Sequence, residues 1–377
     1  MTLLTLTNPR SLGPLTGKGS ASATLERFGV GGCDLGYPVY DEAADRMWLL
    51  FGDTFDQADF NDHSHEIHWR SGVFGILDNF SKKKDFTIDR FYCTESDAPR
   101  ASAPYLSHHL PGFETTKIPT GGIVVNGVFY FFNFNITSWD YPNRQKFACG
   151  SCFKYDEKTN RYLRVFPLTW VNGENPAKET VKQVIQEDDQ LALVGKIDLQ
   201  KHLNPFFSLV YPFDDGDNFI YLFGQGSYRE SPTYVARLRK SQFESFETIE
   251  YLVGFLGKEP VWEKAPEAIG HLYPLLQEGI GEMSLLKIEG RYLLMGLEGW
   301  KSNLIYYQSE SLLGPYSSRQ YLLKGEDPLL EECSPYAPMS HTRFYDPKTK
   351  ELKVIVSKWL PAYNPITLVY HVERKTL

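Results

Sequence analysis

Five short, nearly uninterrupted apolar runs recur along this chain, and each ends in a small residue that opens into a polar or aromatic loop. The runs lie at 47–52, 128–133, 220–224, 292–296 and 352–357. Their ends are irregularly spaced, at roughly one fifth of the chain length. A strand that recurs at this spacing is typical of repeat folds in which each unit buries its apolar face against its neighbours. We therefore expect one repetitive β fold rather than separate domains.

Each run has a predicted strand on either side of it. The preceding strands are expected at 34–40, 120–125, 208–211, 282–288 and 339–345, and the following strands at 72–77, 147–153, 233–238, 303–307 and 366–371. Turns rich in Asp, Asn and Gly separate the first strand of each unit from the second, and Asn126-Gly127 is the sharpest hairpin signal among them. Five copies of this unit predict an all-β, five-bladed β-propeller.

The whole chain, residues 1–377, is predicted to form this single propeller domain. The blades are expected at approximately 30–80, 115–165, 205–250, 280–320 and 335–375, with an insertion at approximately 165–205. Asn175-Pro176 in the insertion predicts the start of a helix. The alternating segment Leu4–Thr7 is expected to pair with the last blade and close the ring, which would remove an exposed sheet edge.

Composition narrows the classes of partner. The formal net charge of −8 and the pI near 5.7 argue against nucleic acid or an anionic membrane surface as a partner. No run of 18 apolar residues predicts a membrane span. The N-terminus lacks a basic region and a long apolar region, and the five cysteines show no framework spacing, so a cytoplasmic location is expected unless a leader has been removed. No obligate protein partner is evident.

Carboxylates and aromatic rings are predicted to gather at one mouth of the propeller. In an antiparallel hairpin the start of the first strand lies beside the end of the second. This places Asp34 and Glu282 at strand starts beside Asp53 and Glu298 at strand ends. The expected mouth also holds Trp69, Trp139, Tyr228, Trp300, Lys358, Trp359 and Tyr363. Carboxylates beneath exposed rings are typical of a carbohydrate site, so we expect a saccharide ligand.

Two of these carboxylates suffice for glycoside hydrolysis. One protonates the leaving oxygen, while the other attacks the anomeric carbon or activates water. Asp34 and Asp53 are expected on adjacent strands of one hairpin, where mutual repulsion and burial would separate their pKa values. The structural alternative is that Asp34 binds backbone amides and Asp53 caps a turn.

Several segments resemble the endo-D-arabinanase family of five-bladed propeller glycosidases, known as glycoside hydrolase family 183 and formerly as an uncharacterised domain family. The similar segments are Gly17–Ser20, Gly32–Gly36, Phe51–Phe55, Trp69–Ser71, Tyr234–Arg237, Gly281–Ser284, Leu313–Tyr316, Ser357–Trp359 and Tyr363-Asn364. The resemblance implies an endo-acting hydrolase of D-arabinan with Asp34 and Asp53 as catalytic residues and no metal or other cofactor. The order with Asp34 as nucleophile and Asp53 as acid/base is favoured, and the reverse order stays open.

The remaining expected substrate contacts are made by residues around this pair. They are Trp69, Arg70, Tyr228, Glu282, Glu298, Trp300, Lys358, Trp359, Tyr363 and Asn364. Arg70, Glu282 and Glu298 have structural alternatives, as an ion pair or as partners of strand-edge amides. A furanosidase of different specificity and a non-catalytic carbohydrate-binding propeller are the alternative functions.

Two other patterns are interpreted as structural. His63, His65 and His68 lie in one loop and have metal-ligand chemistry, but a polar loop is the favoured interpretation. Cys149 and Cys152 have redox spacing, yet they fall in a predicted strand rather than at a helix N-terminus, so no redox role is expected.

Overall fold

The computed structural model describes residues 2–376 except 58–67, 84, 105–115, 139–145, 157, 171–202, 205–208, 227, 265–266, 269, 331–333 and 360–362. The predicted helix of the insertion and Trp139 lie outside the described residues. The chain divides into two compact units, Met1–Pro104 with Ile280–Leu377, and Tyr105–Gly279. Among the described residues, no helix is long and apolar enough to cross a membrane.

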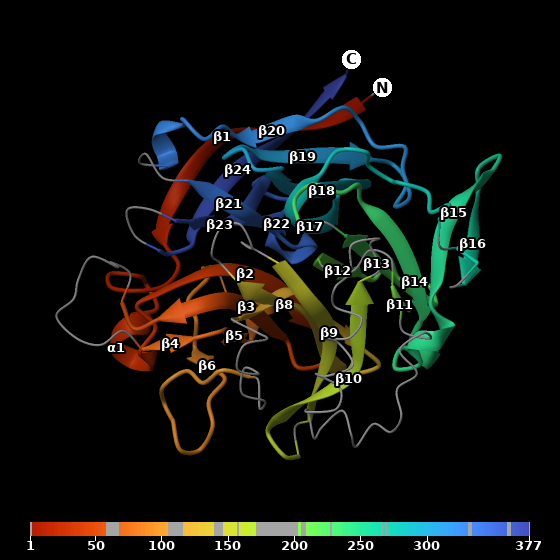
Figure 1. Ribbon diagram of the computed structural model, residues 1–377. Coiled ribbons are helices and arrows are strands. Elements are labelled where there is room, and N and C mark those ends of the chain that lie inside the picture. Colours follow the sequence, from red (N-terminus) through yellow and green to blue (C-terminus); the bar gives the residue numbers. More distant parts are fainter. Residues whose placement is uncertain are drawn as a thin grey trace. The chain divides into compact units, whose positions relative to one another are not determined.

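Three sheets form the first unit (Figure 1). One sheet contains β2 (Gly32–Asp41), β3 (Arg46–Phe55), β4 (Trp69–Arg70), β5 (Val73–Asp78) and β6 (Arg90–Phe91). Another contains β17 (Ile280–Ile288), β18 (Arg291–Glu298), β19 (Leu304–Ser309) and β20 (Gln320–Leu323). The third contains β1 (Thr2–Pro14), β21 (Pro335–Met339), β22 (Tyr345–Asp346), β23 (Glu351–Lys358) and β24 (Ile366–Thr376). The helical turns of this unit are α1 (Thr24–Phe28), η1 (Phe80–Lys82), η5 (Pro328–Leu330) and η6 (Thr342–Phe344).

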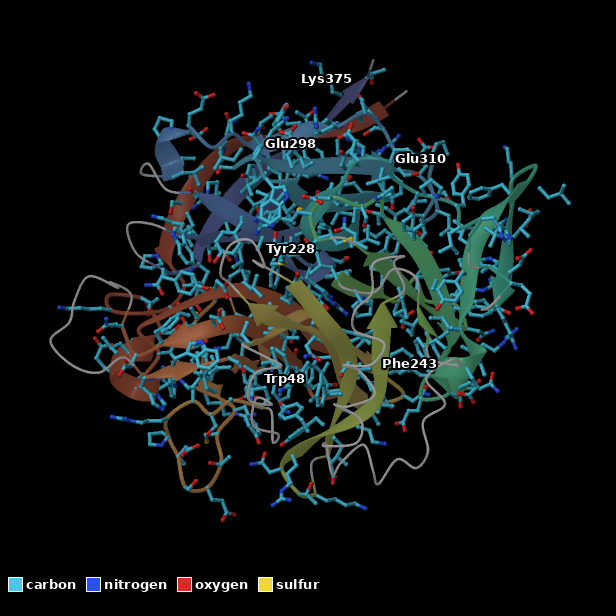
Figure 2. The ribbon with its side chains drawn as sticks, viewed as in Figure 1. Trp48, Tyr228, Phe243, Glu298, Glu310 and Lys375 are labelled. Atoms are coloured by element: carbon cyan, nitrogen blue, oxygen red, sulfur yellow. The ribbon has the colours of Figure 1, made fainter. Side chains whose placement is uncertain are left out.

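Two sheets form the second unit. One contains β7 (Thr116–Val125), β8 (Val128–Ser138), β9 (Lys146–Asp156), β10 (Arg161–Trp170) and β11 (Leu203–Asn204). The other contains β12 (Leu209–Phe213), β13 (Phe219–Gln225), β14 (Tyr234–Arg239), β15 (Glu250–Leu256) and β16 (Glu259–Lys264), with the helical turns η3 (Lys240–Gln242) and η4 (Phe246–Thr248). Phe243, labelled in Figure 2, packs in the apolar core of this unit with a ring–ring distance of 4.7 Å to Tyr130.

These five sheets are the blades of a β-propeller, so the predicted fold class is confirmed. Each predicted apolar run is the second long strand of its blade and is buried on both faces. In β3, for example, Met47, Leu49, Leu50 and Phe51 are fully buried. Asn126 and Gly127 both have positive φ, of 52° and 77°, as a two-residue hairpin turn requires.

The N-terminal strand pairs with the last blade, as predicted. β1 runs antiparallel to β24, with Leu4 opposite Arg374 and Thr7 opposite His371. Leu4 and Leu6 are buried, which gives this strand an apolar inner face. The two ends of the chain therefore contribute neighbouring strands of one sheet (Figure 1).

The first strand of the last blade differs from its prediction at 339–345. The strand β21 ends at Met339, and the 3-10 turn η6 separates it from β22. The side chain of His341 accepts a hydrogen bond from the backbone N–H of Arg343 at 3.0 Å. This cap stabilises a helical turn where the apolar pattern alone predicts a continuous strand.

A β-bulge interrupts the first strand of each blade in the first unit. The residues with positive φ are Leu35 (65°) in β2, Glu282 (30°) in β17 and Ala337 (51°) in β21. The strand register shifts at each of these positions. Such residues are strained in this conformation, and bulges re-aim the side chains beside them. The expected carboxylate mouth lies at these bulges.

Candidate active site

The bulge in β2 buries Asp34, whose side chain is only 7% exposed. Its neighbour Leu35 is held in the positive-φ conformation by a 2.7 Å hydrogen bond from the Leu35 backbone N–H to Ser357 Oγ on β23. Gly52 on β3 supplies the space for the Asp34 carboxylate, because a Cβ at Gly52 would lie 2.3 Å from Asp34 Oδ1. Groups from two blades thus fix the position of the Asp34 carboxylate.

Two tyrosine hydroxyls hold this carboxylate. Tyr336 on β21 donates a hydrogen bond to Asp34 Oδ2 at 2.9 Å, and Tyr363 also hydrogen-bonds Asp34. Burial raises the pKa of both tyrosines well above the usual value, so they remain neutral donors. Tyr336 stands at the strand start of its blade, as Asp34 does, but the sequence does not predict it as a catalytic or substrate-contacting residue. Its position just before the bulge of its blade, where Asp34 stands in the first blade, is the signal that could have indicated it.

The pKa of Asp34 is raised from 3.8 to about 7. Burial is the largest cause, and the negative charge of Asp53 is the next, with a smaller contribution from Glu282. The hydrogen bonds from Tyr363 and Tyr336 act in the opposite direction because they favour the ionised form. Burial and carboxylate repulsion outweigh them, so Asp34 holds its proton up to about neutral pH.

Asp53 lies near the end of β3 and is half-buried. The indole Nε1 of Trp69 donates a hydrogen bond to Asp53 Oδ1 at 3.1 Å, and Trp69 is 36% exposed. The two aspartates are close enough for the charge of one to raise the pKa of the other. The structure thus brings together the pair that the hairpin geometry predicts, with one member protonated near neutral pH.

Aromatic rings extend from this pair toward solvent. Tyr363 makes edge-to-face contacts with Phe55 at 5.6 Å and with Trp359 at 5.4 Å. Trp359 is 49% exposed, and Trp300 after β18 is 52% exposed. Through Tyr363, the exposed indole of Trp359 is joined to the buried Asp34 carboxylate, which gives the site both an apolar contact surface and an acid.

Glu282 on β17 and Lys358 on β23 are buried charged side chains of the same unit. Glu282 is 4% exposed at the bulge of β17, and its charge acts on Asp34. Lys358, at the end of β23, is 6% exposed. In the antiparallel pairing of β23 with β21 its backbone lies opposite Pro335, the residue before Tyr336. Their expected contacts with substrate stay predictions.

Two other predicted contact residues, Glu298 and Arg70, bind protein groups. Glu298, labelled in Figure 2, is 6% exposed and pairs with Lys301 at 2.9 Å and Arg319 at 2.7 Å. Arg70 donates hydrogen bonds to the carbonyl oxygens of Gly29 and Ala101.

Asn364 connects two segments distant in sequence. Its Oδ1 accepts from Thr16 Oγ1 at 2.8 Å, and its Nδ2 donates to the Gly31 carbonyl at 3.2 Å. Tyr228 belongs to the second unit, where its ring lies 5.6 Å from that of Phe134.

The cysteine pair and the histidine loop are the two patterns that are expected to be structural. Cys149 and Cys152 lie in the strand β9, as predicted, and Cys152 is a buried free thiol. His63 and His65 lie outside the described residues. Within the part of the chain that is described, no group of three or more His, Cys, Asp or Glu side chains is arranged to hold a metal ion.

The fold and the site define an all-β propeller with a buried aspartate, whose pKa is raised to about 7, beside a second carboxylate. Residues 19–371 match the model of the family described as a domain of unknown function, DUF4185, and the chain belongs to this family. No curated protein matches the sequence.

Solved structures share the fold at low identity. A Bacteroides ovatus protein provisionally classed as a hydrolase is 12% identical with a TM-score of 0.59, and the match covers 91% of this chain and 86% of that one. A family 117 glycoside hydrolase from Zobellia galactanivorans is 9% identical with a TM-score of 0.45, covering 98% and 90%. A family 43 glycoside hydrolase protein from Bacillus licheniformis is 13% identical with a TM-score of 0.45, covering 92% and 53%.

Proposed function

We propose that this protein is a glycoside hydrolase that cleaves α-furanosidic linkages, with D-arabinan cut at internal positions as its substrate. The observation that carries the proposal is the pair of Asp34 and Asp53, in which the buried member has a pKa raised to about 7. A carboxylic acid that keeps its proton beside an ionised carboxylate is the arrangement that glycosidases use. The similarity of the segments around both aspartates to endo-D-arabinanases supports the choice of substrate.

The raised pKa supports Asp34 as the acid/base and Asp53 as the nucleophile, the reverse of the order that the sequence favours. Asp34 would protonate the leaving oxygen while Asp53 attacks the anomeric carbon and forms a glycosyl-enzyme. Asp34, now ionised, would then take a proton from the water that hydrolyses this intermediate. This retaining route requires a carboxylate separation of about 5–5.5 Å. No step involves a metal ion.

The surrounding side chains supply binding and positioning. Tyr336 and Tyr363 would keep the Asp34 carboxylate oriented through the ionised stage, when their hydrogen bonds are strongest. The exposed indoles of Trp69 and Trp359 offer flat apolar surfaces to the sugar rings. The saccharide is the partner that these features fit.

The test is oligosaccharide release from D-arabinan by the wild-type protein, Asp34→Asn and Asp53→Asn. Asp41→Asn is the matched control, because Asp41 is the last residue of β2, at the opposite end of the strand, where it accepts a hydrogen bond from the Ala44 backbone N–H. We expect release by the wild type and the control and a loss of at least about a thousandfold in both site variants. NMR of the first product should show retention of the anomeric configuration, and inversion would refute the nucleophile role of Asp53.

A non-catalytic carbohydrate-binding protein is the second candidate, because exposed indoles alone suffice to bind sugars. Binding of D-arabinan without cleavage, together with no activity on a panel of other furanosides, would replace the enzyme proposal with this one.

A further inference from the structure

A buried threonine that follows β1 contacts the sequence neighbours of two site residues, Asp34 and Tyr363. Thr16 is fully buried, and its hydroxyl oxygen lies 3.2 Å from Cys33 Sγ and 2.8 Å from Asn364 Oδ1. Cys33 immediately precedes Asp34, and Asn364 immediately follows Tyr363. One hydroxyl therefore joins the neighbour of a carboxylate to the neighbour of the tyrosine that hydrogen-bonds it.

The hydrogen bonds of this group run in one direction. Asn364 Nδ2 donates to the Gly31 carbonyl, which can only accept, so the amide oxygen faces Thr16. Thr16 has a single hydroxyl proton and donates it to Asn364, so the thiol of Cys33 is the donor to Thr16. Burial raises the pKa of this thiol well above its usual value, so it keeps its proton. We call Cys33, Thr16, Asn364 and Gly31 the Thr16 clamp.

The backbone packs closely around the clamp. The Leu15 backbone N–H donates to the Pro365 carbonyl at 2.8 Å, which joins the two segments beside Thr16 and Asn364. A Cβ at Gly17 would lie 2.4 Å from the Gly31 carbonyl oxygen and 2.7 Å from Asn364 Nδ2. Because the clamp is buried, a group that loses its hydrogen bond there cannot turn to bulk water instead.

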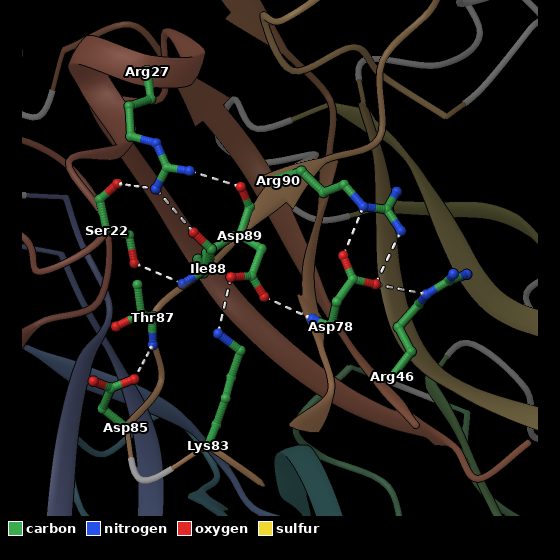
Figure 3. A network of polar contacts seen from close by, with 10 residues as sticks. All are labelled: Ser22, Arg27, Arg46, Asp78, Lys83, Asp85, Thr87, Ile88, Asp89 and Arg90. Carbon is green, nitrogen blue, oxygen red and sulfur yellow. Dashed lines mark hydrogen bonds and ion pairs between the residues drawn. The ribbon is translucent and has the colours of Figure 1, made fainter. Parts of the chain in front are cut away.

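The helical turn α1 anchors the residues next to the clamp. The Thr24 hydroxyl accepts from the Gly17 backbone N–H at 2.6 Å and donates to the Val30 carbonyl at 2.8 Å. Arg27 in the same turn donates to the Asp89 carbonyl at 2.8 Å, within the polar network of Figure 3. The turn is thus fixed to the segment that leads into β6, and the clamp is held by an anchored element.

The position of Tyr363 relative to Asp34 depends on contacts of this kind. Asp34 lies in β2 and Tyr363 precedes β24, so no local structure keeps the two side chains together. The hydrogen bond from Tyr363 favours the ionised carboxylate and opposes the burial that raises the pKa of Asp34 to about 7. A loosened segment would weaken this hydrogen bond and favour the protonated acid.

We propose that Thr16 is a positioning residue of the proposed hydrolase, whose hydroxyl fixes Tyr363 against Asp34 through the residues beside them. The inference rests on the proposed function, because Asp34 is the acid that the clamp would serve. Thr16 acts through Cys33 and Asn364 rather than on the reacting atoms.

The test is a ¹³C NMR titration of the Asp34 carboxyl group in the full chain, with the resonance assigned by its loss in Asp34→Asn. Thr16→Val keeps the shape of the side chain and removes the hydroxyl. It should raise the titration midpoint of Asp34 by about half a pH unit, which is part of the effect of one hydrogen bond. Thr16→Ser keeps the hydroxyl and should restore the wild-type midpoint.

Thr233→Val is the matched control. Thr233 is another fully buried threonine, and its hydroxyl accepts a hydrogen bond from Gln225 at 3.2 Å in the second unit. This variant should lower stability in urea unfolding without moving the midpoint of Asp34. The proposal is overturned if Thr16→Val lowers stability but leaves Asp34 at the wild-type midpoint, or if Thr16→Ser or Thr233→Val shifts the midpoint as far as Thr16→Val does.

A milder variant decides the matter if Thr16→Val does not fold. Cys33→Ala removes the thiol donor and leaves the hydrogen bond between Thr16 and Asn364 in place. The midpoint of Asp34 should then rise by a smaller amount, and an unchanged midpoint would overturn the proposal.

Hydrolysis of D-arabinan gives a second readout of the same change. In Thr16→Val the basic limb of the pH profile of kcat/KM should move to higher pH by the same amount as the NMR midpoint, with KM changed less than kcat. The NMR titration does not require catalysis. A protein that cleaves no D-arabinan could therefore still show the clamp, so failure of the proposed function is a separate outcome.

Discussion

Tyr336 donates a 2.9 Å hydrogen bond to Asp34 from a position 302 residues away in the sequence. Each residue immediately precedes the positive-φ residue of its strand, Ala337 in β21 and Leu35 in β2. The same bulge in two blades therefore presents a donor and an acceptor to each other.

Tyr336→Phe should raise the pKa of Asp34 further, because the hydroxyl favours the ionised carboxylate. If Asp34 is the acid, the basic limb of the pH–rate profile moves to higher pH. The lost hydrogen bond should reduce kcat/KM by about tenfold, which corresponds to about 1.4 kcal/mol. A pH profile of kcat/KM checks both effects, and a basic limb that stays in place would show that another group carries the proton.

Asp34→Asn should stabilise the fold at pH 8. The pKa of Asp34 is raised from 3.8 to about 7, so the folded state binds more protons than the unfolded state between these values. Wild-type stability therefore falls as the pH rises from about 4 to about 7, and the full penalty, on the order of a few kcal/mol, is present above that.

Urea unfolding of both proteins at pH 4 and pH 8 measures this linkage. The variant should gain stability over the wild type at pH 8, with a much smaller difference at pH 4. An equal difference at the two pH values would contradict a raised pKa.

Gly52→Ala should abolish activity by displacing a carboxylate. The added Cβ would lie 2.3 Å from Asp34 Oδ1, and the two tyrosines leave that side chain little freedom to move. Overpacking of this kind costs about 1–3 kcal/mol of stability. Gly127→Ala is the control, because it strains a turn with a φ of 77° but has no close neighbour. In Gly52→Ala both stability and specific activity should fall, whereas in Gly127→Ala only stability should fall.

Trp69→Phe separates the two roles of the indole. The substitution keeps an aromatic surface but removes the 3.1 Å hydrogen bond to Asp53. We expect kcat to fall about tenfold with little change in KM, since the lost contact acts on a reacting carboxylate. Trp359→Ala should instead raise KM, because this exposed ring contacts Tyr363 rather than an aspartate. Equal changes in KM for both variants would argue against this division.

Glu298→Gln should destabilise the protein and spare catalysis. The carboxylate is buried and paired with Lys301 and Arg319, so removing its charge removes both ion pairs. A loss of about 1–3 kcal/mol in unfolding free energy is expected, with kcat/KM unchanged. A raised KM with unchanged stability would instead support the contact between Glu298 and substrate that the sequence predicts.

The sequence determined the repeating β architecture of this protein. Apolar runs such as Met47–Gly52 predict buried strands because burial is set by local side-chain chemistry, and Asn126-Gly127 predicts a hairpin because its backbone preferences are local as well. The alternation in Leu4–Thr7 was sufficient to predict its pairing with the last blade. Asp34 and Asp53 could be placed together for the same reason, since one hairpin joins them.

Only the tertiary structure decided which groups these side chains contact and what charge they carry. Tyr336 reaches Asp34, and Arg319 reaches Glu298, through packing that no local pattern encodes. His341 ended a predicted strand because its side chain caps a helical turn. The pKa of Asp34 depends on burial and on neighbours from other strands, and these are set only when segments distant in sequence pack against each other.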